Sequence, residues 1–223
     1  MRTLILVAGT NAPSNSATLA DHFAQGVRES GGETEVLRLR DLSIAHFTLQ
    51  HYDPTYQNEP DFVKLREAVL HTDGIVIASP IWNFSVPSHL KNAIDRMGSF
   101  ALDGTHSQGM LRGKPVFLIF TGGAPLIAWQ GLEKKTTGFV AESLKYFGAS
   151  IAGTHFEPKC TLGRGQFGLV VDKRPESLAK MRSEGCRFAE MVKVFKETGK
   201  LPMKQSCMTA VYAAGQKLMK KLS

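Results

Sequence analysis

The chain has 223 residues, of which 43% are hydrophobic and 21% charged, and its formal net charge is +7. This length suits one domain with a substantial core, and no apolar run approaches the roughly 20 residues that a membrane-spanning helix needs. Six lysines and one acidic residue lie in residues 196–223, so most of the net charge belongs to this segment and gives little support for a nucleic-acid-binding body.

The elements predicted along the chain alternate between strand and helix. Apolar or alternating runs predict five strands, over residues 4–8, 34–39, 75–78, 116–120 and 150–156. Helices are predicted from the cap Ser16 to the glycines at 31 and 32, from Pro60, after Pro87, over residues 132–147, and from Pro175 to Gly199.

This alternation predicts an α/β fold, because apolar strands separated by helices form a parallel sheet covered on both faces. Right-handed crossovers leave few topologies, and we expect the flavodoxin-like three-layer α/β/α sandwich with strand order 2-1-3-4-5. We expect one domain over residues 1–199 and a basic amphipathic tail helix over 200–223. The long connection over residues 40–59 is of the kind that is often functional.

Two further features concern the surroundings of the protein. The cysteines Cys160, Cys186 and Cys207 are odd in number and widely spaced, which argues against a disulfide framework and against a metal site. The first apolar run is too short for a signal peptide and lacks a cleavage site, so we expect a cytoplasmic protein.

The tail allows two interpretations. It can lie on a membrane surface or dock as a helix on the body or on a neighbouring subunit, and we favour docking because one short helix anchors weakly. Its apolar stripe consists of Met208, Val211, Tyr212, Leu218, Met219 and Leu222, opposite Lys217, Lys220 and Lys221.

The loop after the first strand, residues 9–18, is rich in hydroxyl and amide groups. It lies at the start of a helix, where free N–H groups and the helix dipole favour an anion. It contains neither the Gly-Lys-Ser/Thr of a Walker A loop nor a GxGxxG fingerprint. A single phosphate fits best, and ordinary capping and turn chemistry is the alternative.

Two more loops lie at the same edge of the predicted sheet. Residues 80–84, after the third strand, offer the apolar walls of Trp82 and Phe84 and the polar amide of Asn83, unless these aromatic rings simply pack beneath the loop. After the fourth strand, Gly122 and Gly123 allow close backbone approach to a ligand, with a tight turn as the alternative. Together, the three loops favour a flavin mononucleotide.

Residues 80–95 read Pro-Ile-Trp-Asn-Phe-Ser-Val-Pro-Ser-His-Leu-Lys-Asn-Ala-Ile-Asp and match the pattern P-x-[YW]-N-x-S-x-P-x-x-L-K-N-x-[IL]-D. On this motif the chain resembles the NADPH-dependent FMN reductase family of flavodoxin-like proteins, which includes NAD(P)H:quinone reductases and azoreductases. The resemblance implies FMN as cofactor and NADPH or NADH as co-substrate. It also implies ping-pong hydride transfer to a small acceptor (a free flavin, quinone or azo compound) and a homodimer or homotetramer.

The resemblance also assigns the cofactor site. The phosphate lies near the first loop, and the second and third loops flank the isoalloxazine. Ala12 stands where the family commonly carries an arginine, so neutralisation of the anion falls to the backbone, the helix dipole or a distant cation. The expected cofactor-binding residues are Thr10, Asn11, Ser14, Asn15, Ser16, Thr18, Pro80, Ile81, Trp82, Asn83, Phe84, Thr121, Gly122 and Gly123.

No catalytic acid or base is nominated, because the flavin carries the chemistry and the seven histidines show no paired spacing. His46 and His51 lie in the long connection, where they can border the substrate site. Arg112, Lys114 and Arg164 are candidates for contacting nucleotide phosphates, against the alternative of solvated surface charges.

Two other functions stay open. One is a flavodoxin-like electron carrier that docks with protein partners, although such carriers tend to be smaller and acidic. The other is a flavin-free regulatory or binding module, which the absence of an arginine at Ala12 keeps possible. The sequence does not identify the electron acceptor.

Overall fold

Five strands form one all-parallel sheet in the order β2-β1-β3-β4-β5, which confirms the predicted fold class and topology. The structure is a computed structural model that describes residues 1–163, 166–202 and 210–218. The strands are β1 (Arg2–Val7), β2 (Glu33–Arg38), β3 (Gly74–Pro80), β4 (Pro115–Thr121) and β5 (Ser150–Glu157).

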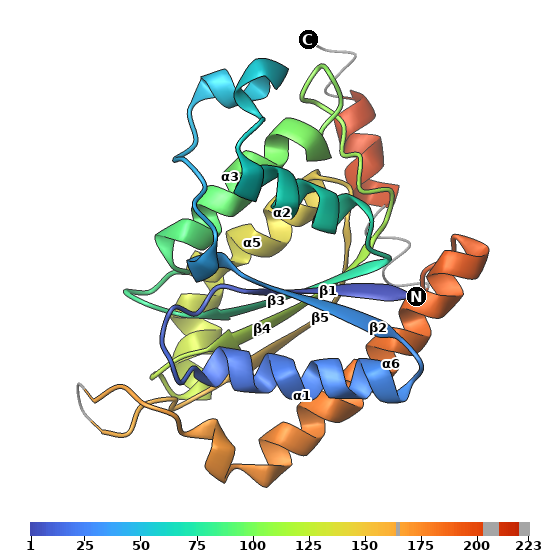
Figure 1. The fold of residues 1–223 in the computed structure, drawn as a ribbon. Helices are drawn as coiled ribbons and strands as arrows, with labels where there is room; N and C mark the ends of the chain where they lie inside the picture. Colours follow the sequence, from blue (N-terminus) through green and yellow to red (C-terminus); the bar gives the residue numbers. More distant parts are fainter. Residues whose placement is uncertain (164–165, 203–209, 219–223) are drawn as a thin grey trace.

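Helices cover both faces of this sheet, with α1 and α6 on one face and α2, α3 and α5 on the other (Figure 1). The helices are α1 (Asn15–Glu29), α2 (Pro60–Leu70), α3 (Ser88–Ala101), α4 (Leu126–Ala128), α5 (Lys134–Tyr146) and α6 (Pro175–Thr198). Short helical turns are η1 (Leu39–Asp41), η2 (Leu49–Tyr52), η3 (Pro54–Tyr56), the π-helical η4 (Trp129–Glu133) and η5 (Val171–Lys173).

Helices α1 and α6 pack closely against each other and against the sheet. A Cβ atom at Gly185 would lie 2.1 Å from the carbonyl oxygen of Phe23, so only glycine allows this approach. The ring of Phe23 lies between those of Phe117 on β4 and Phe188 on α6, with centroids 4.8 Å and 5.6 Å away. This contact fixes α1, and with it the loop that precedes α1, on the sheet.

One predicted helix start is wrong. Ser14, not Ser16, caps α1, because its extended backbone lets its Oγ accept a hydrogen bond from the Ala17 N–H at 3.3 Å. Ser16 lies buried inside the first turn. The helix predicted over residues 132–147 is confirmed as α5 to within two residues, and the short helical turns α4 and η4 that precede it were not predicted.

The long connection over residues 40–59 is tied to the body by the fully buried Arg96 of α3. Its Nη1 donates to the Ala45 carbonyl at 2.9 Å, its Nη2 lies 2.8 Å from Glu59 Oε1, and its guanidinium stacks over the Phe62 ring. His51 is buried in the same connection and its Nδ1 contacts Thr48, so His51 has a structural role.

The described part of the tail, residues 210–218, is helical and contacts the body through two side chains. Gln216 Nε2 donates to the Tyr146 carbonyl at 2.7 Å, and the Tyr212 ring lies 5.5 Å from Lys145 Nζ. Val211 and Leu218 of the predicted stripe are exposed. Among the described helices, none has the length and hydropathy to cross a membrane. Met208, Met219, Lys220, Lys221 and Leu222 lie outside the described residues.

Candidate functional site at the carboxyl edge of the sheet

A hollow of about 60 Å³ lies where β1, β3 and β4 end. All three predicted loops reach it, as expected for loops that follow neighbouring parallel strands. Ten of the predicted residues line it: Asn11, Ser14, Asn15, Ser16, Pro80, Ile81, Trp82, Thr121, Gly122 and Gly123. Thr10, Thr18, Asn83 and Phe84 do not line it.

The first loop forms a narrow cradle at the N-terminus of α1. A Cβ atom at Gly9 would lie 2.6 Å from Ser14 Oγ and 2.7 Å from Ser16 Oγ, and these two hydroxyls lie 3.2 Å apart. The first main-chain N–H groups of a helix have no acceptor within the helix. Of these groups, the Ser14 hydroxyl accepts a hydrogen bond only from the N–H of Ala17. The main-chain N–H groups of Asn15 and Ser16, together with both hydroxyls, therefore suit a small anion.

The side chain of Asn15 joins this loop to the segment after β5. Its Nδ2 donates to the Gly168 carbonyl at 2.8 Å, and its Oδ1 accepts from the main-chain N–H groups of Val170 and Val171 at 2.8 Å and 3.2 Å. Thr18 is likewise engaged, because its Oγ1 donates to the Ser14 carbonyl at 3.0 Å. Both side chains maintain the loop geometry instead of pointing free donors at a ligand.

A cation stands beside this loop although the loop itself has no basic residue. Arg40, in η1 directly after β2, places its Nη1 3.5 Å from the carbonyl oxygen of Thr10. Its Nε also lies 3.3 Å from the exposed carboxylate of Asp41. Arg40 is thus a cation beside the first loop, and it directly follows β2, the strand next to β1.

The second loop makes a tight turn over residues 82–85. Main-chain hydrogen bonds join Trp82 and Ser85 in both directions, at 2.8 Å and 2.9 Å. The two residues between them, Asn83 and Phe84, have φ values of 49° and 66°, which is rare for a bulky side chain. The turn holds Trp82 at the hollow and leaves the Phe84 ring exposed, while the Phe84 carbonyl accepts a hydrogen bond from Thr136 Oγ1 of α5.

The third loop is anchored to its neighbours by its backbone. The Thr121 carbonyl accepts from the Ile81 N–H at 2.7 Å, which joins the second and third loops. The Gly122 N–H donates to the Glu157 carbonyl at 3.1 Å, and its carbonyl accepts from the Cys160 N–H at 2.9 Å. A Cβ atom at Gly122 would lie 3.0 Å from the Phe156 ring, so the glycine allows this packing.

A buried carboxylate organises the chain where it leaves β5. Glu157 accepts from Arg174 Nη1 at 2.7 Å and from Ser177 Oγ at 3.0 Å, and its Oε2 lies 3.1 Å from His155 Nε2. Burial alone would raise the pKa of this carboxyl, but the hydrogen bonds from His155, Arg174 and Ser177 outweigh burial and lower the pKa. The charged network fixes the segment that follows.

That segment supplies four lining residues that sequence reasoning missed. A signal was available, because Thr161 and the exposed aromatic Phe167 follow the last strand at the same sheet edge, where ligands sit. Burial raises the pKa of the Cys160 thiol to about 12, so this cysteine is an inert part of the wall. The missed residues are Cys160, Thr161, Phe167 and Gly168.

Other candidates lie elsewhere. Arg112 and Lys114 precede β4 and line a cavity at the opposite end of the sheet, away from the hollow. Burial lowers the pKa of Lys114 to about 8, and its Nζ donates to the carbonyls of Val69 and Leu70. His89 Nε2 lies 2.6 Å from the Ala8 carbonyl, to which it donates, joining α3 to the end of β1. Arg164 lies outside the described residues.

The family model for NADPH-dependent FMN reductases matches residues 1–134, which is more than half of the chain and includes all three loops. The chain belongs to the NADPH-dependent FMN reductase family. The matched residues hold every predicted cofactor-binding position, whereas the four lining residues after β5 lie beyond them.

Individual relatives of this FMN reductase family member agree with the match. An FMN-dependent NADH:quinone oxidoreductase of Shewanella sp. (strain W3-18-1) is 35% identical over 127 residues, covering 49% of this chain and 63% of the relative. The match thus spans less than two thirds of that relative's length.

Solved structures show the same fold. The NAD(P)H:quinone oxidoreductase of Methanothermobacter marburgensis has a TM-score of 0.64 at 19% identity, covering 84% of this chain and 96% of its own. An FMN-dependent NADH-azoreductase from Bacillus anthracis (strain Ames Ancestor), solved in complex with FMN, has a TM-score of 0.60 at 16% identity. The match covers 85% of this chain and 100% of the azoreductase chain. Among the described residues, no cluster of three or more His, Cys, Asp or Glu could hold a metal ion.

Proposed function

We propose that this FMN reductase family member is an FMN-dependent NAD(P)H oxidoreductase that reduces a small acceptor such as a quinone, an azo compound or a free flavin. The observation that carries the proposal is the hollow at the carboxyl edge, where a donor-rich helix N-terminus meets an aromatic loop and a glycine loop. Family membership and the quinone oxidoreductases among the relatives support it.

The residues around the hollow fit the phosphate end of FMN. A hollow of about 60 Å³ is far smaller than the roughly 300–1,000 Å³ of a pocket that encloses a whole ligand, so it can hold only one end of the nucleotide. The cradle of Gly9, Ser14 and Ser16 suits the phosphate, and Arg40 offers the countercharge. The ring system would extend over Trp82 and the Gly122-Gly123 backbone towards the exposed ring of Phe84.

When bound, FMN accepts a hydride from the nicotinamide and passes it on, so that NAD(P)H, one proton and the acceptor give NAD(P)⁺ and the reduced acceptor. The chain contributes binding and orientation. Ser14, Ser16 and the first amides of α1 hold the phosphate, and the Thr121–Ile81 hydrogen bond keeps the two ring-flanking loops at a fixed spacing.

We also propose that a homodimer contact lies at the same edge of the sheet. Phe84, Leu126, Ile127 and Leu132 are exposed apolar side chains on the second loop and on the helical turns after the third. Exposed apolar side chains that form a patch mark interaction sites. A homodimer through this surface would cover the rim of the flavin site, and Ile127→Glu should then give a monomer in sedimentation experiments.

The proposal also covers the domain organisation and the cellular location. Residues 1–199 form the flavin-binding domain, and residues 200–223 are an appended tail. The unpaired thiols Cys160 and Cys186 are typical of a reducing compartment, which supports a cytoplasmic location.

Steady-state kinetics with the FMN-saturated protein test the proposal. A reductase that releases NAD(P)⁺ before it binds the acceptor gives parallel double-reciprocal lines, and FMN should remain with the protein through gel filtration. Bound FMN that NAD(P)H does not reduce would instead indicate an electron carrier. Absence of FMN binding would leave only the flavin-free module.

A further inference from the structure

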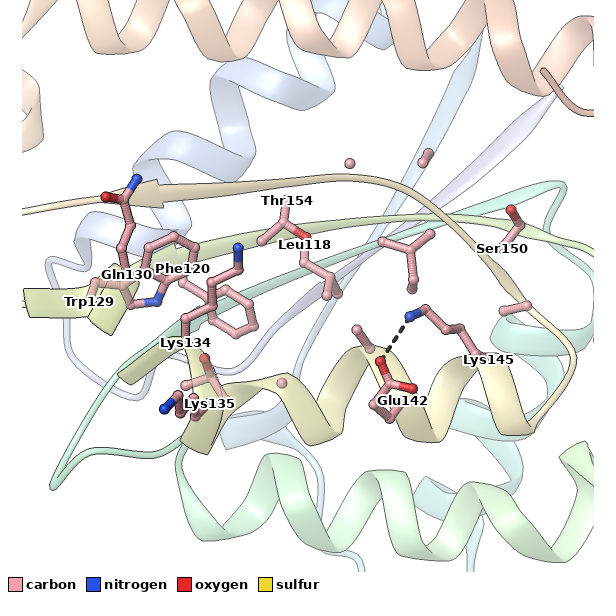
Figure 2. A pocket seen from close by; sticks show the side chains of 17 residues that line it. Leu118, Phe120, Trp129, Gln130, Lys134, Lys135, Glu142, Lys145, Ser150 and Thr154 are labelled. Carbon is pink, nitrogen blue, oxygen red and sulfur yellow. Dashed lines mark hydrogen bonds and ion pairs between the residues drawn. The ribbon is translucent and has the colours of Figure 1, made fainter. Parts of the chain in front are cut away.

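A second cavity in the described part of the chain lies away from the flavin hollow, between α5 and the strands β4 and β5, of which β5 is an edge strand of the sheet (Figure 2). Its volume is about 800 Å³, within the roughly 300–1,000 Å³ typical of small-molecule sites. It shares no lining residue with the hollow. We name it the α5–β5 pocket.

Small side chains on the facing elements create this pocket. Gly138 and Ala141 lie on the face of α5 that lines the pocket, where larger residues would normally fill the space between a helix and a sheet. A Cβ atom at Gly138 would meet nothing within 4 Å. The buried side chains of Leu118 and Phe120 on β4 form an apolar floor.

The charges along the pocket favour an anion. Lys134, Lys135 and Lys145 line it with a single acidic residue, Glu142, which pairs with Lys145 at 2.8 Å. Lys134 makes no ion pair with any residue of the described ranges, and its Nζ lies 5.8 Å from the centroid of the Trp129 ring. Figure 2 shows Lys134, Trp129 and Phe120 together at one end, with Lys145 and Glu142 at the other.

The Lys134 end also contains a buried donor without a partner. Trp129 is 7% exposed and lines the pocket, and its indole Nε1 has no acceptor among the residues that the structure describes. Buried N–H groups normally have a partner, and one left without costs about 1–3 kcal/mol. An unpaired ammonium and an unpaired N–H at the same end of an apolar cavity are complementary to one anionic group with hydrogen-bond acceptors.

We propose that the α5–β5 pocket binds a small planar apolar anion, such as an aromatic carboxylate or sulfonate. The anionic group lies beside Lys134 and Trp129, and the ring body lies over Leu118 and Phe120 against Gly138. The site is additional to the flavin site, but the two adjoin, because the Trp129 ring stacks on that of Phe156 at 4.7 Å and Phe156 packs beneath Gly122.

Two fluorescent probes test this proposal on the FMN-saturated protein. One is 8-anilinonaphthalene-1-sulfonate, and the other is N-phenyl-1-naphthylamine, the same ring body without the anionic group. We expect saturable binding of the sulfonate at one site per chain. Lys134→Gln should weaken sulfonate binding roughly tenfold, the loss expected for one charge-assisted contact, and leave binding of the neutral probe unchanged.

A filling variant tests the location. Gly138→Leu occupies the pocket without a backbone clash and improves helix propensity, so it should fold normally and abolish binding of both probes. Gly215→Leu is the matched control, since Gly215 is also helical, has open space at its Cβ and lies outside the pocket, and it should bind like the wild type.

Three results would overturn the proposal. The first is sulfonate binding that survives Gly138→Leu, and the second is an equal effect of Lys134→Gln on the binding of both probes. The third is a Gly138→Leu protein that still binds the probes but no longer self-associates, because the pocket would then be a contact between copies of the chain. If the protein binds no FMN, the same titrations on the flavin-free protein still decide, because no pocket residue belongs to the hollow.

Discussion

Arg40 Nη1 lies 3.5 Å from the carbonyl oxygen of Thr10, so a cation that follows β2 stands beside the first loop, which has no basic residue of its own. Under the proposed function, this cation would help to neutralise the FMN phosphate in a chain that has alanine at position 12. The side chain of Arg40 is one-third exposed (34%), so solvent weakens its contribution.

Arg40→Gln should therefore weaken binding of FMN by roughly fivefold to tenfold and leave binding of riboflavin, which lacks the phosphate, unchanged. Flavin fluorescence titration measures both constants. Arg28→Gln is the control, because it removes the same charge at the opposite end of the sheet, where Arg28 contacts Thr34. Equal losses for FMN and riboflavin would show that Arg40 does not act on the phosphate.

The Asn15 side chain should be worth more to stability than its position in a surface loop suggests. Asn15→Ala leaves the Gly168 carbonyl and the Val170 N–H without their partner, at a cost of about 2 kcal/mol. Urea unfolding measures this, and hydrogen exchange at residues 168–171 should become faster. Asn11→Ala, an exposed change in the same loop, should be nearly neutral. A wild-type unfolding midpoint for Asn15→Ala would refute the role of this clamp.

The sequence predicted the fold and the position of the three loops, but not the side-chain contacts of Arg40 and Asn15. Apolar runs such as residues 75–78 predict buried strands, and their alternation with helices such as the one after Pro87 made the strand order predictable, and with it the three loops at one edge of the sheet. Arg40 beside Thr10 depends on β2 lying next to β1 and on side-chain reach, and neither leaves a pattern in the sequence.

Irregular segments were predicted least well. Cys160, Thr161, Phe167 and Gly168 line the hollow but belong to no periodic element, and the position of Gly168 depends on Asn15, which is 153 residues away in the sequence. The choice between Ser14 and Ser16 as cap was equally local, because both are good capping residues and only the backbone conformation distinguishes them.

Phe84 stores strain in the second loop. At φ 66°, a residue with a Cβ atom costs roughly 1–2 kcal/mol relative to its ordinary conformation. Phe84→Gly should thus be at least as stable as the wild type, whereas Phe84→Ala keeps the strain and loses the ring. Both variants should bind FMN more weakly, because each lacks the aromatic ring. Thermal unfolding together with FMN titration separates the two effects, and a Phe84→Gly protein that unfolds more easily than Phe84→Ala would contradict the strain.

The Glu157 network should make stability depend on pH. The pKa of this carboxyl is lowered in the folded chain from its ordinary value of 4.5, so its stabilisation is fully present above that value and is lost as the pH falls through the folded-state pKa. Glu157→Gln should cost about 3 kcal/mol at neutral pH, and the difference from wild type should shrink below pH 4.5.

Unfolding midpoints of wild type and Glu157→Gln over a pH series check this. Glu142→Gln serves as the control, since its carboxylate is 55% exposed and pairs only with Lys145 at the surface. A Glu157→Gln deficit that stays constant down to low pH would mean that the charge of Glu157 does not stabilise the fold.

The most direct test of the flavin site is an anaerobic spectrum of the FMN-saturated protein after one equivalent of NADPH or NADH. The expected result is loss of the visible flavin band and its return when a quinone is added, with both responses weakened in Gly9→Val, whose side chain would fill the cradle between Ser14 and Ser16. A protein that retains no FMN, or a flavin band that neither cofactor bleaches, would contradict the proposed function.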